Sequence, residues 1–193
     1  DMVYEDLTTG FPLFRMLEHW NGGINRHSIP LNGDTFAIPS IDEIEFRAIP
    51  VKGKAPPYSP HRNDPHTGDN IGIQVIDTKT NKTLFYSPGL GEPTEDTISL
   101  MNQSDCLLVD GTFWEEGEMS KVGLGDKKAA DMGHLPQSGD EGMIELLRPM
   151  DKPRKVLIHI NNTNPILDED SIERETLEKE GIEVAFDGME LEL

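Results

Sequence analysis

Four segments of the chain combine histidine or aspartate with turn-forming residues. Neutral imidazole nitrogens and ionised carboxylate oxygens are the ligands that first-row divalent metals take at short range. No spacing among them forms a stand-alone motif such as His-Glu-x-x-His, so the pattern allows a metal site without defining one. The segments are Ser59–Asn70, with two histidines and two aspartates; Val109–Trp114, with Asp110; Met132–Gly139, with His134; and Leu157–Pro165, with His159.

Each of these residues also has a purely structural interpretation. His159 lies in an apolar stretch and could be a hydrogen-bonded core histidine. Asp110 could cap the turn that follows it, and His134 could be an exposed turn residue. The run Asn161–Asn164 is typical of turns. Residue types alone therefore leave both the structural and the chemical interpretation open.

The surrounding pattern predicts an α/β architecture in which helices cover a sheet. Alternating or continuous apolar residues predict strands at 44–48, 71–76, 83–86, 106–109, 155–160 and 182–186. Helices are predicted from Pro12, at 95–102, over most of 126–148 with a break at Gly133–Gly139, and at 171–180. The polar segments follow these strands, where α/β folds place ligands and catalytic groups. The stretch 52–70 has no periodicity, and a loop that long is usually functional or disordered.

Composition excludes several functional classes. A length of 193 residues lies within the usual size range of one domain. The chain has 17 Lys and Arg against 36 Asp and Glu, which gives a formal charge of -19. That charge repels phosphate backbones and anionic lipids, and no apolar run approaches the roughly 20 residues that cross a bilayer. We therefore expect neither nucleic-acid nor membrane partners. The single cysteine, Cys106, fits a reducing compartment, so we expect a cytoplasmic protein. The chain does not begin with Met, which indicates a start within a longer protein.

Four longer strings carry a family resemblance. They are Glu5–Pro12, Pro56–Arg62, Gly68–Gly72 and His159–Asp168. Together they resemble the coenzyme PQQ synthesis protein B family, which belongs to the metallo-β-lactamase superfamily. The resemblance implies an αββα sandwich, with residues 1–193 forming the C-terminal part of a single domain that is incomplete at its N-terminus.

The resemblance also implies roles for the candidate residues. In a related branch of the superfamily, one metal-binding histidine lies six residues before a strand-opening glycine, as His66 does before Gly72. The final ligand of that branch ends an apolar strand, which His159 resembles. Asp110 and His134 resemble a carboxylate–histidine proton relay, so we expect a hydrogen bond between them. We expect the substrate to be held by His61, Arg62, Asp69 and Asn162.

Two departures from the superfamily pattern limit the expected site. The segment His-x-His-x-Asp-His is absent, and Tyr86–Leu90 stands where the superfamily has a bridging aspartate. These departures favour one metal over two. The resemblance implies one divalent ion, with Fe²⁺ expected and Zn²⁺ as the alternative. Because only part of the ligand set is present, we expect the 193-residue chain by itself to bind metal weakly.

The implied function is a step in pyrroloquinoline quinone (PQQ) biosynthesis. The first expectation is an iron-dependent oxygenase that hydroxylates a tyrosine-derived ring of a pathway intermediate. Three alternatives stay open: a binding or carrier protein that takes PQQ or its precursor to the periplasm, a metal-dependent hydrolase of the lactamase type, and a fragment with no activity. The expected partner is the small-molecule precursor, and a homodimer is also allowed.

Overall fold

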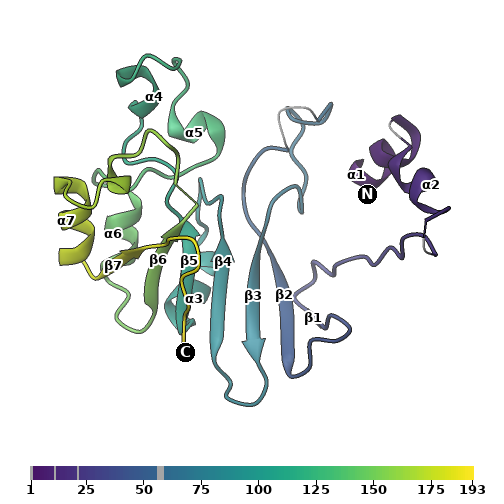
Figure 1. The fold of residues 1–193 in the computed structure, drawn as a ribbon. Helices are drawn as coiled ribbons and strands as arrows, with labels where there is room; N and C mark the ends of the chain where they lie inside the picture. Colours follow the sequence, from purple (N-terminus) through teal and green to yellow (C-terminus); the bar gives the residue numbers. More distant parts are fainter. Residues whose placement is uncertain (1, 11, 21, 56–58) are drawn as a thin grey trace.

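The computed structural model describes residues 2–10, 12–20, 22–55 and 59–193 (Figure 1). Residues 56–58, which belong to one of the family-like strings, lie outside the described residues. One sheet runs through the structure with its strands in the order β1 to β7. The strands are β1 (Thr35–Phe36), β2 (Ile44–Pro50), β3 (Ile71–Asp77), β4 (Thr83–Ser87), β5 (Cys106–Asp110), β6 (Arg154–Ile158) and β7 (Ile182–Val184).

The sheet changes character at β4. Strands β1 to β4 pair antiparallel, whereas β4 to β7 pair parallel. A tight turn joins β3 to β4, in which Asp77 Oδ1 accepts hydrogen bonds from the amides of Lys79 at 2.8 Å and Thr80 at 3.2 Å. The parallel strands need longer crossover connections, and these contain the helices. The order of elements therefore separates a hairpin half from an α/β half.

Three helices cover one face of the α/β half: α3 (Glu95–Gln103), α6 (Met143–Leu147) and α7 (Ile172–Lys179). In α3, Thr94 Oγ1 accepts from the Thr97 amide at 3.3 Å, which caps the first turn as the sequence preference for threonine predicts. The helices pack on side chains that the strand register places on one face. The central fully buried members are Phe85, Met101, Leu107, Val109, Met143, Leu147, Leu157 and Leu177.

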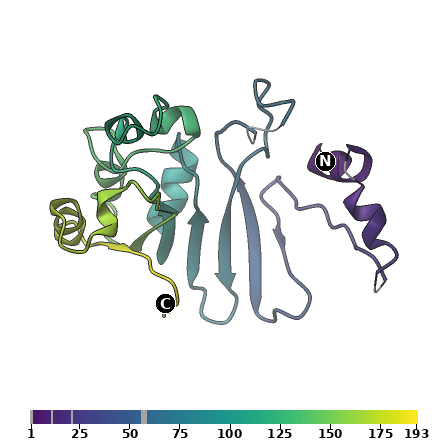
Figure 2. The same ribbon diagram turned by 45° about the horizontal axis from the view of Figure 1, so that its top comes forward.

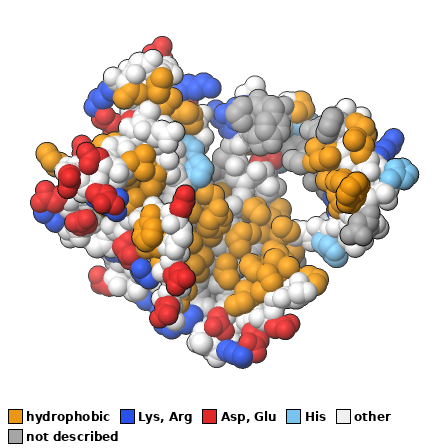
Figure 3. Space-filling view, in the orientation of Figure 1, with side chains coloured by type: hydrophobic (Ala, Val, Ile, Leu, Met, Phe, Trp, Pro, Cys, Tyr) orange, Lys and Arg blue, Asp and Glu red, His pale blue; other side chains and the backbone are white. Residues whose placement is uncertain are grey.

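The opposite face of the sheet is also apolar. The register aligns Phe46, Val75 and Leu84 across β2, β3 and β4, and each is only partly buried. Figure 3 shows hydrophobic side chains spread over this face. Of the two sheets expected in an αββα sandwich, the described residues form one.

Each predicted strand is present, but the strands predicted at 155–160 and 182–186 end two residues early, at Ile158 and Val184. The backbone after Ile158 turns toward Thr112, whose hydroxyl lies 2.9 Å from the His159 carbonyl oxygen and whose carbonyl accepts from the Asn161 amide at 3.1 Å. The break predicted at Gly133–Gly139 is confirmed, since Gly133 ends α5 (Ala129–Met132) in a left-handed conformation (φ 90°) and Pro136 lacks an amide hydrogen. The helices on either side are shorter than predicted, because α5 has four residues and α6 starts only at Met143.

The N-terminal part lies beyond the β1 edge of the sheet, as Figures 1 and 2 both show. It contains α1 (Met2–Glu5), a π-helical turn (Asp6–Gly10) and α2 (Leu13–Leu17). Helix α2 starts directly after Pro12, as the sequence predicts, since proline is tolerated at a helix start. No helix among the described residues is long and apolar enough to cross a membrane.

The topology gathers the predicted site segments at one edge. Strands β2, β4, β5 and β6 all end at the upper edge in Figure 1, where α4 (Glu118–Lys121) and α5 lie. An isolated bridge between Lys52 and Glu92 ties the connection after β2 to the one after β4. The loop 52–70 therefore shares this edge with the residues that follow β5 and β6.

At the other edge, Asp105 gives a pH-dependent contribution to stability. Burial raises the pKa of this carboxyl, but the Thr83 amide at 2.9 Å and the ammonium groups of Lys82 and Lys152 outweigh burial, so the pKa falls below its usual 3.8. A lowered folded-state pKa stabilises the fold above about pH 4, and this stabilisation is lost as the pH falls through the lower value.

We expect Asp105→Ala to lower the free energy of unfolding by about 1–3 kcal/mol at pH 7, because the Thr83 amide loses its acceptor. Urea denaturation at pH 7 and at pH 3 should show this deficit shrinking at the lower pH. The exposed Asp151 serves as the control, and Asp151→Ala should change stability by no more than about 0.5 kcal/mol. A deficit that is the same at both pH values would contradict the prediction.

Candidate functional site

The site is built around Asp110, the last residue of β5. Its side chain is fully buried at the end of an apolar strand that pairs with β4 and β6. Oδ1 accepts from the Thr112 amide at 3.0 Å and from the Thr112 hydroxyl at 2.7 Å. Oδ2 accepts from the Leu90 amide at 3.0 Å and is 2.8 Å from His134 Nδ1. Four donors thus converge on a carboxylate that is removed from water.

The hydrogen bond expected between Asp110 and His134 is present. His134 follows α5, and its backbone amide donates to the Ala129 carbonyl at 3.1 Å, which fixes the residue against the helix. Its side chain is only 17% exposed. Because an ionised carboxylate can only accept hydrogen bonds, Nδ1 of His134 carries the proton in this pair. The Nε2 atom is then left with its lone pair.

His159 lies beside this pair, one residue after β6, and is exposed. Its Nδ1 atom is 3.0 Å from the Thr112 hydroxyl, and its ring stacks on that of His134 with centroids 5.8 Å apart and planes 18° apart. The interpretation of His159 as a buried core histidine is therefore wrong.

Asp110, His134 and His159 each offer one possible ligand atom, and these atoms lie within 4.8 Å of one another. The group is one that could hold a divalent metal ion by geometry. The two oxygens of Asp110 are already used by four donors, however, and direct metal ligation would displace Thr112 from Oδ1, or Leu90 or His134 from Oδ2. The arrangement therefore favours a metal on His159, with Asp110 and His134 acting as a hydrogen-bonded pair next to it.

Backbone packing fixes this geometry. A Cβ atom on Gly111 would lie 2.8 Å from Leu157 Cβ and 2.9 Å from the Ile158 carbonyl oxygen, so only glycine lets β5 leave the sheet this close to β6. Gly111 also donates to the Ile158 carbonyl at 2.7 Å. The buried Asn164 side chain donates to the carbonyls of Gly111 at 3.0 Å and Thr112 at 3.2 Å. The turn after β5 is thus held from both sides.

We expect Gly111→Ala to destabilise the protein by about 1–3 kcal/mol, because the added methyl group meets backbone that cannot move aside. Gly89 is the matched control, since a Cβ there meets nothing within 4 Å. Chemical denaturation of both variants checks the prediction. Equal stability of Gly111→Ala and Gly89→Ala would show that the turn after β5 can relax.

The second predicted ligand, His66, lies in the loop after β2. Its ring is exposed, with Nε2 3.7 Å from Asp64 Oδ2 and the ring centroid 6.4 Å from that of His61. Within the described ranges, no hydrogen bond, ion pair or ring contact joins this loop to Asp110, His134 or His159. Joint ligation by His66 and His159 stays a prediction.

The predicted substrate-binding residues occupy the same edge of the sheet. Arg62 Nη1 donates to the Ala55 carbonyl at 2.7 Å, and Asp69 Oδ2 accepts from the His66 amide at 2.8 Å, so both hold the loop itself. The side chains of His61 and Asn162 are exposed. A substrate role for these four residues stays a prediction.

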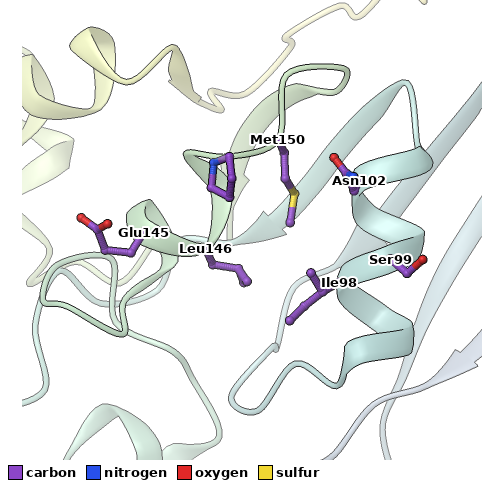
Figure 4. Close-up of a pocket in the computed structure, with 7 residues that line it drawn as sticks. Ile98, Ser99, Asn102, Glu145, Leu146 and Met150 are labelled. Atoms are coloured by element: carbon purple, nitrogen blue, oxygen red, sulfur yellow. The ribbon is translucent and has the colours of Figure 1, made fainter.

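A cavity elsewhere in the fold is unrelated to this chemistry. It measures about 280 Å³, lies between α3 and α6 and contains none of the candidate residues (Figure 4). Its lining consists of Ile98, Ser99, Asn102, Glu145, Leu146, Pro149 and Met150. This mainly apolar lining offers little for catalysis, so the strand-end cluster remains the candidate site.

Several contributors to the site have no clear signal in the sequence. Thr112 is the second residue after Asp110, but its type gives no sign that its hydroxyl contacts several side chains and a carbonyl at once. The Leu90 amide comes from the very segment that lacks a bridging aspartate, and a backbone donor has no sequence signal. Asn164 carries only the signal of a turn residue.

Comparison with known proteins agrees with this fold. A family model described as the beta-lactamase superfamily domain matches residues 1–160. Coenzyme PQQ synthesis protein B of Pseudomonas syringae pv. syringae (strain B728a) is 57% identical over 193 residues, and that of Methylococcus capsulatus (strain Bath) is 56% identical. Each match covers the whole of this chain, which spans 63% of the length of those curated relatives.

A solved structure is also similar. The crystal structure of Zn²⁺-bound PqqB from Methylobacterium extorquens matches with a TM-score of 0.74 and 32% sequence identity, over 90% of this chain and 55% of that one. The fold is therefore metallo-β-lactamase-like, as the sequence predicts. Because the family model covers most of its residues, the chain belongs to the β-lactamase superfamily.

Proposed function

We propose that this chain takes part in PQQ biosynthesis, as the C-terminal part of an enzyme that hydroxylates a tyrosine-derived ring in a pathway intermediate with molecular oxygen and a two-electron reductant. One oxygen atom of O₂ enters the ring as a hydroxyl group, and the other is reduced to water. The similarity to coenzyme PQQ synthesis protein B supports the pathway. The observation that carries the proposal of an enzyme is the pair of Asp110 and His134 at 2.8 Å beside the exposed ring of His159.

A carrier has no need of this arrangement. Binding a precursor requires a pocket with a few polar groups, whereas here a fully buried carboxylate orients an imidazole through Nδ1. Such a pairing holds the ring in one orientation and fixes which nitrogen is available, and both properties serve proton transfer. The pair therefore favours catalysis over transport.

One divalent ion fits the donor set. Imidazole nitrogen suits both zinc and iron, and His159 with His66 would hold the ion in this chain. A bound Fe²⁺ would supply the redox chemistry that activation of oxygen requires and that Zn²⁺ lacks. The Zn²⁺ in the Methylobacterium extorquens structure shows that a divalent ion binds to that relative.

The remaining roles follow from position. His134 would accept or return a proton through Nε2, while Asp110 keeps the proton on Nδ1. Exposed groups at the same edge, His61 and Asn162, would hold polar groups of the precursor, together with Arg62 and Asp69. The formal charge of -19 disfavours nucleic-acid and anionic membrane partners, so a small molecule is the expected partner. The single cysteine, Cys106, fits the cytoplasm as the expected compartment.

The test is turnover of the PQQ precursor by the full-length protein purified without oxygen. Samples loaded with Fe²⁺ or Zn²⁺ are given the precursor and ascorbate as the reductant, with and without O₂, and products are read by mass spectrometry. The proposal expects a gain of one oxygen atom only with Fe²⁺ and O₂. Hydrolysis with Zn²⁺ in the absence of O₂ would support a hydrolase instead. Tight binding of the precursor without any change in its mass would support a carrier.

A further inference from the structure

We propose that Thr112 is a positioning residue that fixes the tautomer of His159. In this tautomer Nδ1 carries the proton, and the lone pair of Nε2 is free for a metal ion. The inference rests on the proposed function only where it assigns His159 as a metal ligand. The protonation pattern itself depends on contacts between residues of this chain.

The Thr112 hydroxyl is the centre of the site. Its Oγ1 atom lies 2.7 Å from Asp110 Oδ1 and 2.9 Å from the His159 carbonyl oxygen. The same atom lies 3.0 Å from His159 Nδ1 and 3.1 Å from His134 Nδ1. All four distances are within the range of a hydrogen bond. One hydroxyl therefore contacts every functional group of the cluster.

Counting protons decides the roles. A hydroxyl group has one hydrogen to donate and two lone pairs that accept. Two of its neighbours, the Asp110 carboxylate and the His159 carbonyl, can only accept, so the single hydrogen goes to one of them. Toward His159 Nδ1 the hydroxyl must then act as the acceptor. It follows that His159 carries its proton on Nδ1.

The position of the Thr112 hydroxyl is restricted, because burial and three further hydrogen bonds hold the residue in place. Its side chain is buried, with only 6% of the residue exposed. Its amide donates to Asp110 Oδ1 at 3.0 Å, and its carbonyl accepts from the Asn161 amide at 3.1 Å and from Asn164 Nδ2 at 3.2 Å. The acceptor is thus fixed in place before any metal arrives.

His134 provides an internal control. Its Nδ1 atom is also near the Thr112 hydroxyl, at 3.1 Å, but is closer to Asp110 Oδ2, at 2.8 Å. Removing the hydroxyl therefore leaves His134 with its carboxylate partner. His159 Nδ1, in contrast, loses its hydrogen-bond partner. Among the described residues, the Thr112 hydroxyl is the one side chain that bonds to this nitrogen. The two rings of one stacked pair should respond differently to a single substitution.

The experiment uses the full-length, metal-free protein labelled with ¹⁵N in histidine, with the His159 and His134 signals assigned from His159→Gln and His134→Gln. Long-range ¹H–¹⁵N spectra at pH 8 report which ring nitrogen carries the proton. Thr112→Val removes the hydroxyl at nearly constant volume, and Thr112→Ser keeps it. Calorimetric titration with Zn²⁺ then measures affinity in all three proteins.

We expect Nδ1–H on His159 in the wild type and in Thr112→Ser. In Thr112→Val we expect His159 to shift toward the Nε2–H form while His134 stays Nδ1–H, which also shows that the fold is intact. Zn²⁺ affinity should fall about 10- to 100-fold in the valine variant and recover in the serine variant. Nδ1–H on His159 in Thr112→Val, or Nε2–H on His159 in the wild type, would overturn the inference. Turnover is measured in a separate experiment. If the proposed oxygenation fails, the tautomer of His159 and the Zn²⁺ affinity can still be interpreted.

Discussion

Replacing His159 with alanine should abolish tight metal binding by the full-length protein. His159 is the one member of the strand-end cluster that is exposed, and its Nε2 atom is left free once Nδ1 bonds to Thr112. Loss of a residue that hydrogen-bonds to a metal ligand lowers metal affinity by about 10- to 100-fold. Loss of the ligand itself should therefore lower metal affinity by at least about 100-fold. Calorimetric titration with Fe²⁺ under nitrogen, and with Zn²⁺ in air, measures the change.

His27 serves as the matched control, because it is also exposed and lies far from β5 and β6 in the sequence. His27→Ala should bind either ion as the wild type does. If His159→Ala retained one tight site per chain, a metal would be bound by other residues, and the assignment of His159 would be wrong. The variant should remain folded, because the ring of His159 contributes little to the buried core.

Replacing His134 with alanine should slow turnover by about 10²- to 10⁴-fold, the range for a lost general acid or base, while metal affinity changes by less than about tenfold. The two effects separate because His134 Nδ1 is bonded to Asp110 and is not free to bind a metal. The measurement is the single-turnover rate at equal metal occupancy.

Asp110→Asn tests the same pair from the other side. An amide in place of the carboxylate can turn its NH₂ group toward Nδ1 and stabilise the wrong tautomer of His134. The turnover rate of the double variant Asp110→Asn/His134→Ala should lie within about threefold of the rate of the slower single variant. Two residues that act as one unit make a shared contribution, which either single substitution already removes. Fully multiplicative losses would show that Asp110 and His134 act independently.

The sequence predicted the parts of the site that depend on strand position. Asp110 ends one apolar strand and His159 follows another, so the sequence placed both at strand ends, where α/β folds position ligands and catalytic groups. The parallel pairing of β5 and β6 brings these two ends to one edge. The pairing of Asp110 with His134 came from the family resemblance. The hydrogen bond at 2.8 Å confirms that pairing, while the proton-relay role stays a prediction.

The remaining features depend on tertiary contacts that have no signal in the chain. The Thr112 hydroxyl gains its role only because the residue after β6 turns back toward it, and the same contact ends β6 two residues early. The Leu90 amide reaches Asp110 through packing of the β4–α3 connection. The placement of His66 depends on the loop 52–70, whose turns are held by its own side chains, such as Asp69.

The most direct test of the proposed oxygenation is the origin of the oxygen in the product. The full-length protein, loaded with Fe²⁺ and supplied with ascorbate as the two-electron reductant, is allowed to turn over the tyrosine-derived PQQ precursor under ¹⁸O₂ in ordinary water. The product is analysed by mass spectrometry. We predict one ¹⁸O atom on the ring in the wild type and none above background in His159→Ala. A product that carries oxygen only from water, or a precursor that is bound and recovered unchanged, would contradict this function.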